Sequence, residues 1–399
     1  MYFILFVDRV NISTAAPLIA SDLQLGNTQL GLVFSAFAFP YAVFQLIGGW
    51  IGDRFGAWLV LTACLVVVGF STALTGLAGG LTSLVAIRLA LGFGEGAAFP
   101  TATRAMASWT PAGSWGFAQG IVHAAARIGN ALTPPLVTAL LAFRSWRGVF
   151  VILGLASLVW PAVWMWFFRD DPRQHFAMTA DQLSTLPPHA TGTRSRRVPW
   201  LRLARRMLPV TIVDFCYGWT LWLFLSWIPS FFFQNYRLNL QASALFSTGV
   251  FLAGVVGDTL GGVASDALLR KTGSLVAARR YVIIAGFVGA FVFLLPVVLI
   301  HEVNVAAVCL SLAFFFLELI VGPIWSIPMD IAPRYAGSAS GMMNFGFGVA
   351  GIISPFSFGY LVDRTGGWVF PFVASLVLLP IGAVLALRLR PDQPFLTLE

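Results

Sequence analysis

Two oppositely charged residues, Arg88 and Glu95, lie seven positions apart within an otherwise apolar stretch. Seven residues make about two turns of α-helix, roughly 10.5 Å, so both side chains lie on one face. Helical side chains lean toward the N-terminus, which brings Glu95 toward Arg88. An anion bound to the guanidinium would compete with Glu95 and favour its protonated form. This spacing predicts a proton switch operated by an anion; the alternative is a permanent structural ion pair.

A second acid–base couple, Asp8 and Arg9, stands in the first apolar stretch. Adjacent residues point about 100° apart on a helix, so Asp8 could exchange a proton toward the cavity while Arg9 meets a ligand. Arg127 follows His123 by one turn, and it either adds positive potential to the same cavity or pairs between helices.

Ionisable groups in hydrocarbon are costly, so they usually face a cavity or a partner. We expect structural roles for Asp214 and Asp258, which we place near span ends, and for Glu318. Further polar or aromatic groups within apolar stretches are candidates to contact a ligand: Tyr41, Tyr217, Trp219 and Asn344.

The composition decides where these groups lie. Hydrophobic residues make up 58% of the 399-residue chain, charged residues 10%, and the mean hydropathy is +0.85. Soluble domains carry about 25% charged residues. The chain is therefore predicted to be an all-α membrane protein, since each crossing needs about 20 apolar residues.

The net charge of +8 does not indicate a nucleic-acid partner, because the basic residues cluster in particular connections. Arginines gather between the two apolar halves and in the C-terminal tail, whereas 21–29 and 76–83 contain no Lys or Arg. This bias places both termini and the central loop in the cytoplasm of a cell with the chain in its inner membrane. The three cysteines are isolated and no metal spacing occurs, so no cofactor is expected.

Twelve transmembrane helices in two six-helix bundles are predicted. The N-terminal bundle covers 1–168, a cytoplasmic linker loop 169–206, the C-terminal bundle 207–390 and a short tail 391–399. The expected crossings are 1–20, 28–51, 58–79, 82–106, 116–141, 146–168, 207–234, 242–267, 279–300, 304–330, 337–362 and 367–388.

The two halves repeat one another. The second and eighth crossings both end in Gly-Gly-x-x-x-Asp, as Gly48-Gly49 to Asp53 and Gly261-Gly262 to Asp266, and Glu318 occupies the repeat position of Glu95. A duplicated unit of this kind places a ligand site near the midplane and supplies two bodies that rock for alternating access.

Several motifs resemble the major facilitator superfamily, and within it the anion:cation symporter family. Gly49-x-x-x-Asp53-Arg54-x-Gly56 looks like the loop motif of the superfamily. The narrower motifs are Asp8-Arg9-x-Asn11-Ile12-Ser13, Arg88 to Pro100, Ser145-Trp146-Arg147, Phe168 to Arg173 and Phe215 to Trp219. The resemblance implies a monomeric, proton-driven importer of organic anions, such as sugar acids or aromatic carboxylates, with lipid as its other partner. It implies that Asp8 and Glu95 carry protons and that Arg9, Arg88 and Tyr41 line the anion site.

Three alternatives remain open. Paired arginines also suit phosphate-ester exchange, since Arg recognises phosphate as well as carboxylate. The other two are drug export by the same fold and a transporter-like sensor. No nucleophile–base spacing indicates an enzyme.

The resemblance places Asp8 near mid-membrane, yet it lies about 10 Å along a helix from Met1. We hypothesise that the cytoplasmic half of the first helix precedes the sequence given.

Overall fold

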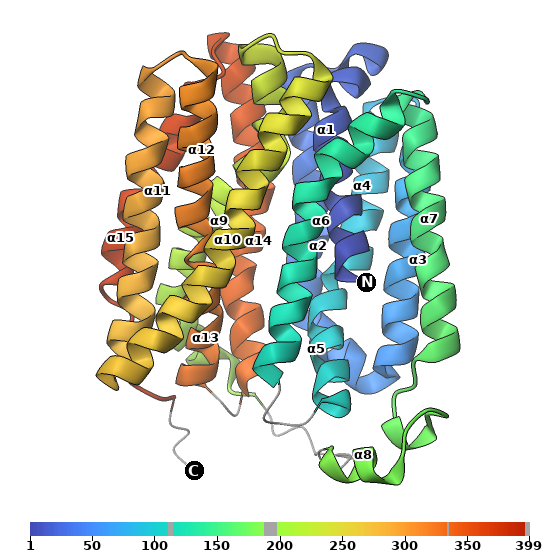
Figure 1. Ribbon diagram of the computed structural model, residues 1–399, viewed down its shortest axis with the longest axis vertical. Coiled ribbons are helices and arrows are strands. Elements are labelled where there is room, and N and C mark those ends of the chain that lie inside the picture. The colour runs from blue at the N-terminus through green and yellow to red at the C-terminus, as the bar shows by residue number, and fades with distance from the viewer. Residues whose placement is uncertain (111–114, 187–197, 333–334, 396–399) are drawn as a thin grey trace.

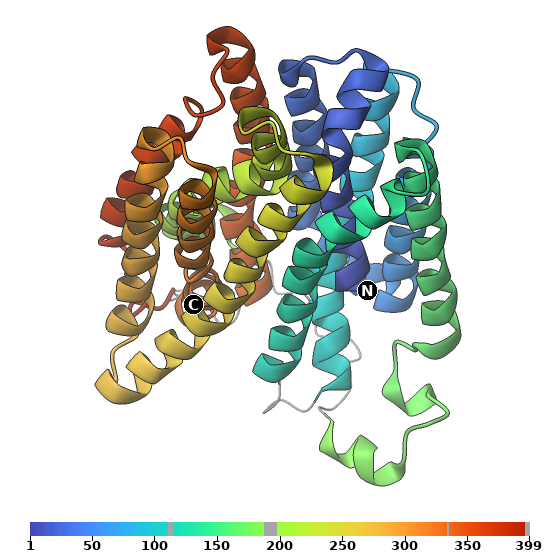
Figure 2. The ribbon, with the colours of Figure 1, turned by 45° about the horizontal axis from the view of Figure 1, so that its top comes forward.

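The computed structural model describes residues 1–110, 115–186, 198–332 and 335–395, and within these ranges it is helical without strands. Helices are the expected outcome because a backbone in hydrocarbon must satisfy its hydrogen bonds within its own segment. Figures 1 and 2 show two helical bundles side by side, with the N-terminal half in blue to green and the C-terminal half in yellow to red.

The N-terminal half contains six crossings, and the fourth of them is broken. Its helices are α1 (Tyr2–Leu23), α2 (Asn27–Phe55), α3 (Ala57–Thr75), α4 (Leu81–Gly96), α5 (Ala98–Trp109), α6 (Trp115–Leu141) and α7 (Trp146–Phe167). The predicted crossing 82–106 is thus two helices, α4 and α5, that meet at Ala97. Glu95 stands directly before this break.

The C-terminal half repeats the arrangement. The connecting segment holds η2 (Pro172–Gln174) and α8 (Ala180–Thr185), followed by α9 (Trp200–Asn235), α10 (Leu240–Thr272), η3 (Ala277–Tyr281), α11 (Val282–Leu299), α12 (Val303–Glu318), α13 (Val321–Ile331), α14 (Ala336–Thr365) and α15 (Phe372–Ala386). Here too the fourth crossing is broken, into α12 and α13, directly after a glutamate. With each broken pair taken as one, the described residues make the twelve predicted crossings.

The predicted linker differs from the structure at its end. Helix α9 begins at Trp200 rather than at 207, so the arginines at 202, 205 and 206 lie on a helix. Residues 187–197 lie outside the described part of the chain. Figure 1 places α8 at the lower end of the molecule, which we name the linker end; the opposite end is the distal end.

The halves meet most closely along α2 and α14. A Cβ atom added at Gly359 would lie 2.1 Å from the carbonyl oxygen of Asn27, and one added at Gly348 would lie 2.4 Å from Cβ of Ala42. Glycine is therefore required at both places for the backbones to approach so closely. The two contacts lie 11 residues apart on α14 and 15 residues apart on α2, so the halves are closed on each other along this stretch of the interface.

At the distal end, Asp363 of α14 joins the other half through the N-terminus of α2. Its two carboxylate oxygens accept hydrogen bonds from the backbone N–H groups of Asn27 (3.3 Å) and Thr28 (2.7 Å) and from both their side chains. Carboxylates stabilise helix N-termini because the exposed N–H groups and the helix dipole favour negative charge there. Asp363 is thus a helix cap that acts between the two halves.

Candidate functional site

Arg9 and Glu95 form an ion pair inside the N-terminal half, and both side chains are almost fully buried. The Nε atom of Arg9 donates to Oε2 of Glu95 at 3.0 Å, and Nη2 of Arg9 contacts the same oxygen. The other oxygen, Oε1, has no hydrogen-bond partner among the described residues. The sequence predicted that Glu95 leans toward Arg88 on the same face of α4, but the direct ion pair of Glu95 is with Arg9. Arg9 reaches Glu95 from the facing helix α1, whereas Arg88 is two turns away on the same helix.

Arg88 therefore remains without a carboxylate partner in the described residues. It is 4% exposed, its Nε atom has no hydrogen-bond partner, and its Nη2 atom makes one long contact of 3.5 Å with the backbone oxygen of Arg9. Its guanidinium lies 5.0 Å from the ring centre of Phe37. A buried cation with so little compensation is costly, and an anion beside it would be strongly favoured.

Aromatic rings surround the guanidinium of Arg9. The ring centres of Phe6, Phe37, Tyr41 and Trp222 lie 4.4, 5.2, 4.8 and 5.9 Å from its central carbon. Such rings attract a cation through their negative faces. Trp222 comes from α9 of the other half, so the site spans the interface. Sequence reasoning named Tyr41 but missed Phe37, which stands one turn before it, and Trp222.

A small enclosed cavity lies at this place. Its lining comes from both halves and consists of Arg9, Val10, Ile12, Ser13, Phe34, Arg88, Trp222, Leu225 and Ser226. The space is enough for about one water molecule. The two predicted arginines thus face one cavity at the interface, and the halves must move apart before an organic ion can enter.

Asp8 points away from Arg9, as the helix geometry predicts. Its Oδ2 atom accepts a 2.7 Å hydrogen bond from the hydroxyl of Ser157 on α7, and Oδ1 has no partner among the described residues. Asp8 is fully buried. It therefore lies behind the cavity, between α1 and α7, and Ser157 is a further contact that the sequence did not suggest.

Arg127 bridges the two halves. Its Nε atom donates to Oδ2 of Asp258 on α10 at 3.0 Å, and its Nη2 atom lies 2.9 Å from Oε2 of Glu318 on α12. Of the two predicted roles, this geometry fits pairing between helices. The expectation that Asp258 lies near a span end is wrong, because it stands in the middle of α10.

The other predicted ligand contacts lie in the C-terminal half. The ring of Tyr217 stacks at 6.1 Å on Phe347, Trp219 has an indole N–H without a partner among the described residues, and Asn344 is buried with its amide N–H₂ unbonded. The structure brings Tyr41 to Arg9 but does not bring Tyr217, Trp219 or Asn344 into the lining of the cavity. Their contact with a ligand stays a prediction.

The repeated motif lies at the linker end. The surroundings of Gly49 and the side chain of Asp53 fall outside the described part, and the guanidinium of Arg54 lies 5.7 Å from the ring centre of its neighbour Phe55. In the second copy, a Cβ atom added at Gly262 would meet open space. A Cβ atom added at Gly322 would lie 2.8 Å from the backbone of Gly262, so α10 and α13 are in close contact at this point.

Asp266 of the second copy lies 3.5 Å from Nη1 of Arg279. Arg279 also donates to Ser265 at 2.7 Å and to Asp330 of α13 at 2.9 Å. This cluster ties three elements of one half together; a conformational role for the motif stays a prediction.

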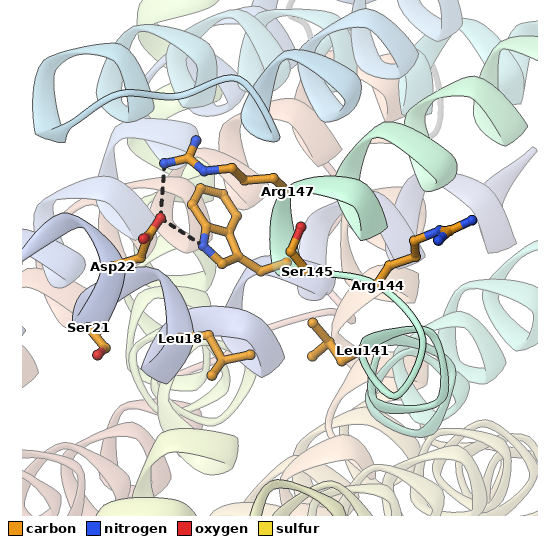
Figure 3. Close-up of a pocket in the computed structure, with 8 residues that line it drawn as sticks. Leu18, Ser21, Asp22, Leu141, Arg144, Ser145 and Arg147 are labelled. Atoms are coloured by element: carbon orange, nitrogen blue, oxygen red, sulfur yellow. Dashed lines mark hydrogen bonds and ion pairs between the residues drawn. The ribbon is translucent and has the colours of Figure 1, made fainter.

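A wider groove opens at the distal end (Figure 3), and it belongs to the Ser145-Trp146-Arg147 motif. Asp22 accepts hydrogen bonds from the indole of Trp146 at 3.1 Å and from Arg147 at 2.9 Å. Arg147 also donates to the carbonyl oxygen of Ala78 at 2.6 Å. Because these bonds of Trp146 and Arg147 join α1, α7 and the turn before α4, we assign the motif a structural role.

Comparison with known proteins agrees with this architecture. The family model described as Major Facilitator Superfamily matches residues 1–355. A probable sulfoacetate transporter from Cupriavidus necator is 49% identical over 98% of this chain and 92% of its own length. A probable galactarate/D-glucarate transporter from Escherichia coli K12 is 30% identical over 96% and 89%, and a hexuronate transporter from Bacillus subtilis is 29% identical over 90% and 85%.

Solved structures share the fold at low sequence identity. A bacterial homologue of the human lysosomal transporter Spinster, inward-facing and unoccupied, superposes with a TM-score of 0.78 at 16% identity, covering 97% of this chain and 94% of its own. A D-xylose–proton symporter gives 0.73 at 17% identity, with the same coverage. The predicted fold class and superfamily are confirmed. The chain belongs to the major facilitator superfamily and is a multi-pass membrane transporter, not an enzyme.

Proposed function

We propose that this protein imports a small organic anion together with protons across the inner membrane, with both termini in the cytoplasm. The observation that carries the proposal is the buried guanidinium of Arg88, which lines the interface cavity without a carboxylate partner among the described residues. A site that exposes an uncompensated cation to a small cavity selects an anion.

Coupling to protons follows from the Arg9–Glu95 pair. Arg9 lines the same cavity as Arg88, so a carboxylate or sulfonate between the two guanidinium groups competes with Glu95 for Arg9. Once displaced, Glu95 would be a buried carboxylate beside a second negative charge, an arrangement that favours its protonation. The anion and the proton would then be taken up together. Asp8, which shares α1 with Arg9, is the second proposed proton carrier.

The chemistry of the cavity favours a compact anion. Phe6, Phe37, Tyr41 and Trp222 enclose Arg9, and the walls offer few hydroxyl or amide groups for a polyhydroxylated chain. The relative at 49% identity is named for sulfoacetate, whereas relatives near 30% are named for sugar acids. We therefore propose a short sulfonated or carboxylated acid as substrate. Sulfoacetate is the preferred candidate, and sugar acids are the second.

Vesicles that contain the purified protein and an internal pH dye test this proposal. Sulfoacetate, hexuronates, galactarate and glucarate are added outside, one at a time. We expect internal acidification with one of them in the wild type and none with Glu95→Gln. Acidification that persists in Glu95→Gln would refute the coupling role of this residue.

Anion exchange is the second candidate, because two facing arginines also suit a phosphate ester. Counterflow of a labelled phosphate ester, with no pH change in the wild type, would identify an exchanger and refute proton import.

A further inference from the structure

The C-terminal half contains its own buried glutamate at the position that matches Glu95. Glu318 is the last residue of α12, and Glu95 is the last but one of α4. The fourth crossing of each half breaks at this point. Glu318 is 0% exposed, and neither Oε1 nor Oε2 has a hydrogen-bond partner among the described residues, although Oε2 lies 2.9 Å from Nη2 of Arg127. Gly254 on α10 leaves room for it, since a Cβ there would lie 3.1 Å from Cγ of Glu318.

The two glutamates differ in the origin of their arginine. Glu95 pairs with Arg9 of its own half, whereas Glu318 pairs with Arg127 of the opposite half. Helices α6 and α10 pack against each other where the halves meet (Figure 1). Rocking of the halves therefore leaves the Arg9–Glu95 pair intact but separates Arg127 from Glu318.

The charges around Glu318 do not balance when all groups are ionised. Arg127 is shared by Glu318 and Asp258, which leaves one excess negative charge. Helix α9 adds the phenol of Tyr217 and, three residues before it, the buried carboxyl group of Asp214, whereas α11 contains no ionisable residue between 282 and 299. His123 on α6 packs against the rings of Phe99 and Trp325 and forms no ion pair within the described residues.

An excess charge buried between packed helices is strongly unfavourable and is usually removed by neutralisation. Between the two carboxyl groups, Asp258 retains some contact with solvent, with 13% of its side chain exposed against 0% for Glu318. We propose that Glu318 binds a proton from the outer side as the halves close on Arg127 around the anion, and releases it to the cytoplasm when they separate there and water reaches the carboxyl group. The anion-free protein returns with Glu318 ionised, so the C-terminal half contributes one proton to each transport cycle.

This inference rests on the proposed proton-coupled uptake, and the ratio of protons to anions tests the two separately. The ratio is measured in vesicles as acidification per labelled anion taken up. We expect Glu318→Gln to take up the anion with about one proton fewer than the wild type. Glu302→Gln, the same change at the exposed start of α12, is the matched control and should keep the wild-type ratio.

Asp258→Asn provides a second variant should Glu318→Gln fail to fold. It removes the excess negative charge, so Glu318 can remain ionised against Arg127 and the ratio should again fall by about one proton. An unchanged ratio of protons to anions in either folded variant overturns the inference about Glu318 and leaves the proposed proton-coupled uptake unaffected. A wild type without any anion-dependent acidification refutes the proposed function instead.

Infrared spectroscopy gives a readout independent of transport. The closed wild-type protein at neutral pH should show the C=O stretch of a protonated carboxyl group that is lost in Glu318→Gln and kept in Glu302→Gln. A ratio that falls in His123→Gln but not in Glu318→Gln would assign the proton to the imidazole and overturn the inference.

Discussion

Arg9 and Glu95 meet through a single carboxylate oxygen, Oε2, while Oε1 of Glu95 stays without a partner among the described residues. The pair joins α1 to α4 inside one half, so it can persist while the two halves move. Its arginine also lines the interface cavity. The same guanidinium therefore serves the internal carboxylate and is accessible to an anion that enters between the halves.

Arg9→Met is expected to destabilise the protein strongly. Breaking a buried pair by removing one partner costs about 3–5 kcal/mol, because the remaining charge is left uncompensated. Arg9→Met combined with Glu95→Gln should recover most of this loss. The unfolding midpoints of the wild type, Arg9→Met and the double variant in detergent check the prediction, and a double variant no more stable than Arg9→Met contradicts it.

Arg88→Ala is expected to weaken anion binding while the fold is retained. Hydrogen bonds to charged groups contribute about 1.5–3 kcal/mol, so the dissociation constant should rise by roughly 10- to 100-fold. Calorimetric titration with the transported anion measures this change. Arg144→Ala, an exposed arginine of the distal groove, is the control. An equal loss of anion affinity in both variants would mean that the lower net charge of the protein, and not the position of Arg88, causes the effect.

Asp363→Ala is expected to shift the protein toward forms that are open at the distal end. Loss of a helix cap costs about 0.5–2 kcal/mol, and here the cap joins the halves, so the equilibrium should move by roughly 2- to 30-fold. Distances between spin labels on α2 and α14 report the populations.

Asn239→Ala removes a cap within the C-terminal half, where Asn239 accepts from the N–H of Ala242, and should leave these distances unchanged. Asp363→Asn keeps a hydrogen-bond acceptor, so its distances between the spin labels should lie between those of Asp363→Ala and those of the wild type. The prediction is wrong if Asp363→Ala and Asn239→Ala give the same distances between the spin labels.

Gly359→Ala is expected to oppose the closed interface between α2 and α14. The added Cβ would lie 2.1 Å from the carbonyl oxygen of Asn27, and backbone atoms cannot yield as a flexible side chain can. Slower uptake and longer distances between spin labels at the distal end should follow. Gly249→Ala, where a Cβ meets open space, should be neutral or slightly stabilising. Wild-type distances in Gly359→Ala would exclude a requirement for this close approach.

Much of the architecture could be predicted from composition and repeat. Long apolar segments with few charged residues must cross as helices, since hydrocarbon satisfies no backbone hydrogen bond. The crossings therefore follow from the sequence to within a few residues, apart from the start of α9 and the breaks after Glu95 and Glu318. Asp8, Arg9, Arg88 and Glu95 could be singled out because a charge in such a segment is costly.

Which of these charges pair was decided only by tertiary structure. The spacing of Arg88 and Glu95 placed them on one face, but Arg9 reaches Glu95 from the facing helix at hydrogen-bond distance. The link from Arg127 to Glu318 depends on how the two halves dock. Helical periodicity fixes which face of its own helix a side chain occupies, whereas the partner on that face depends on the packing of helices far apart in the sequence.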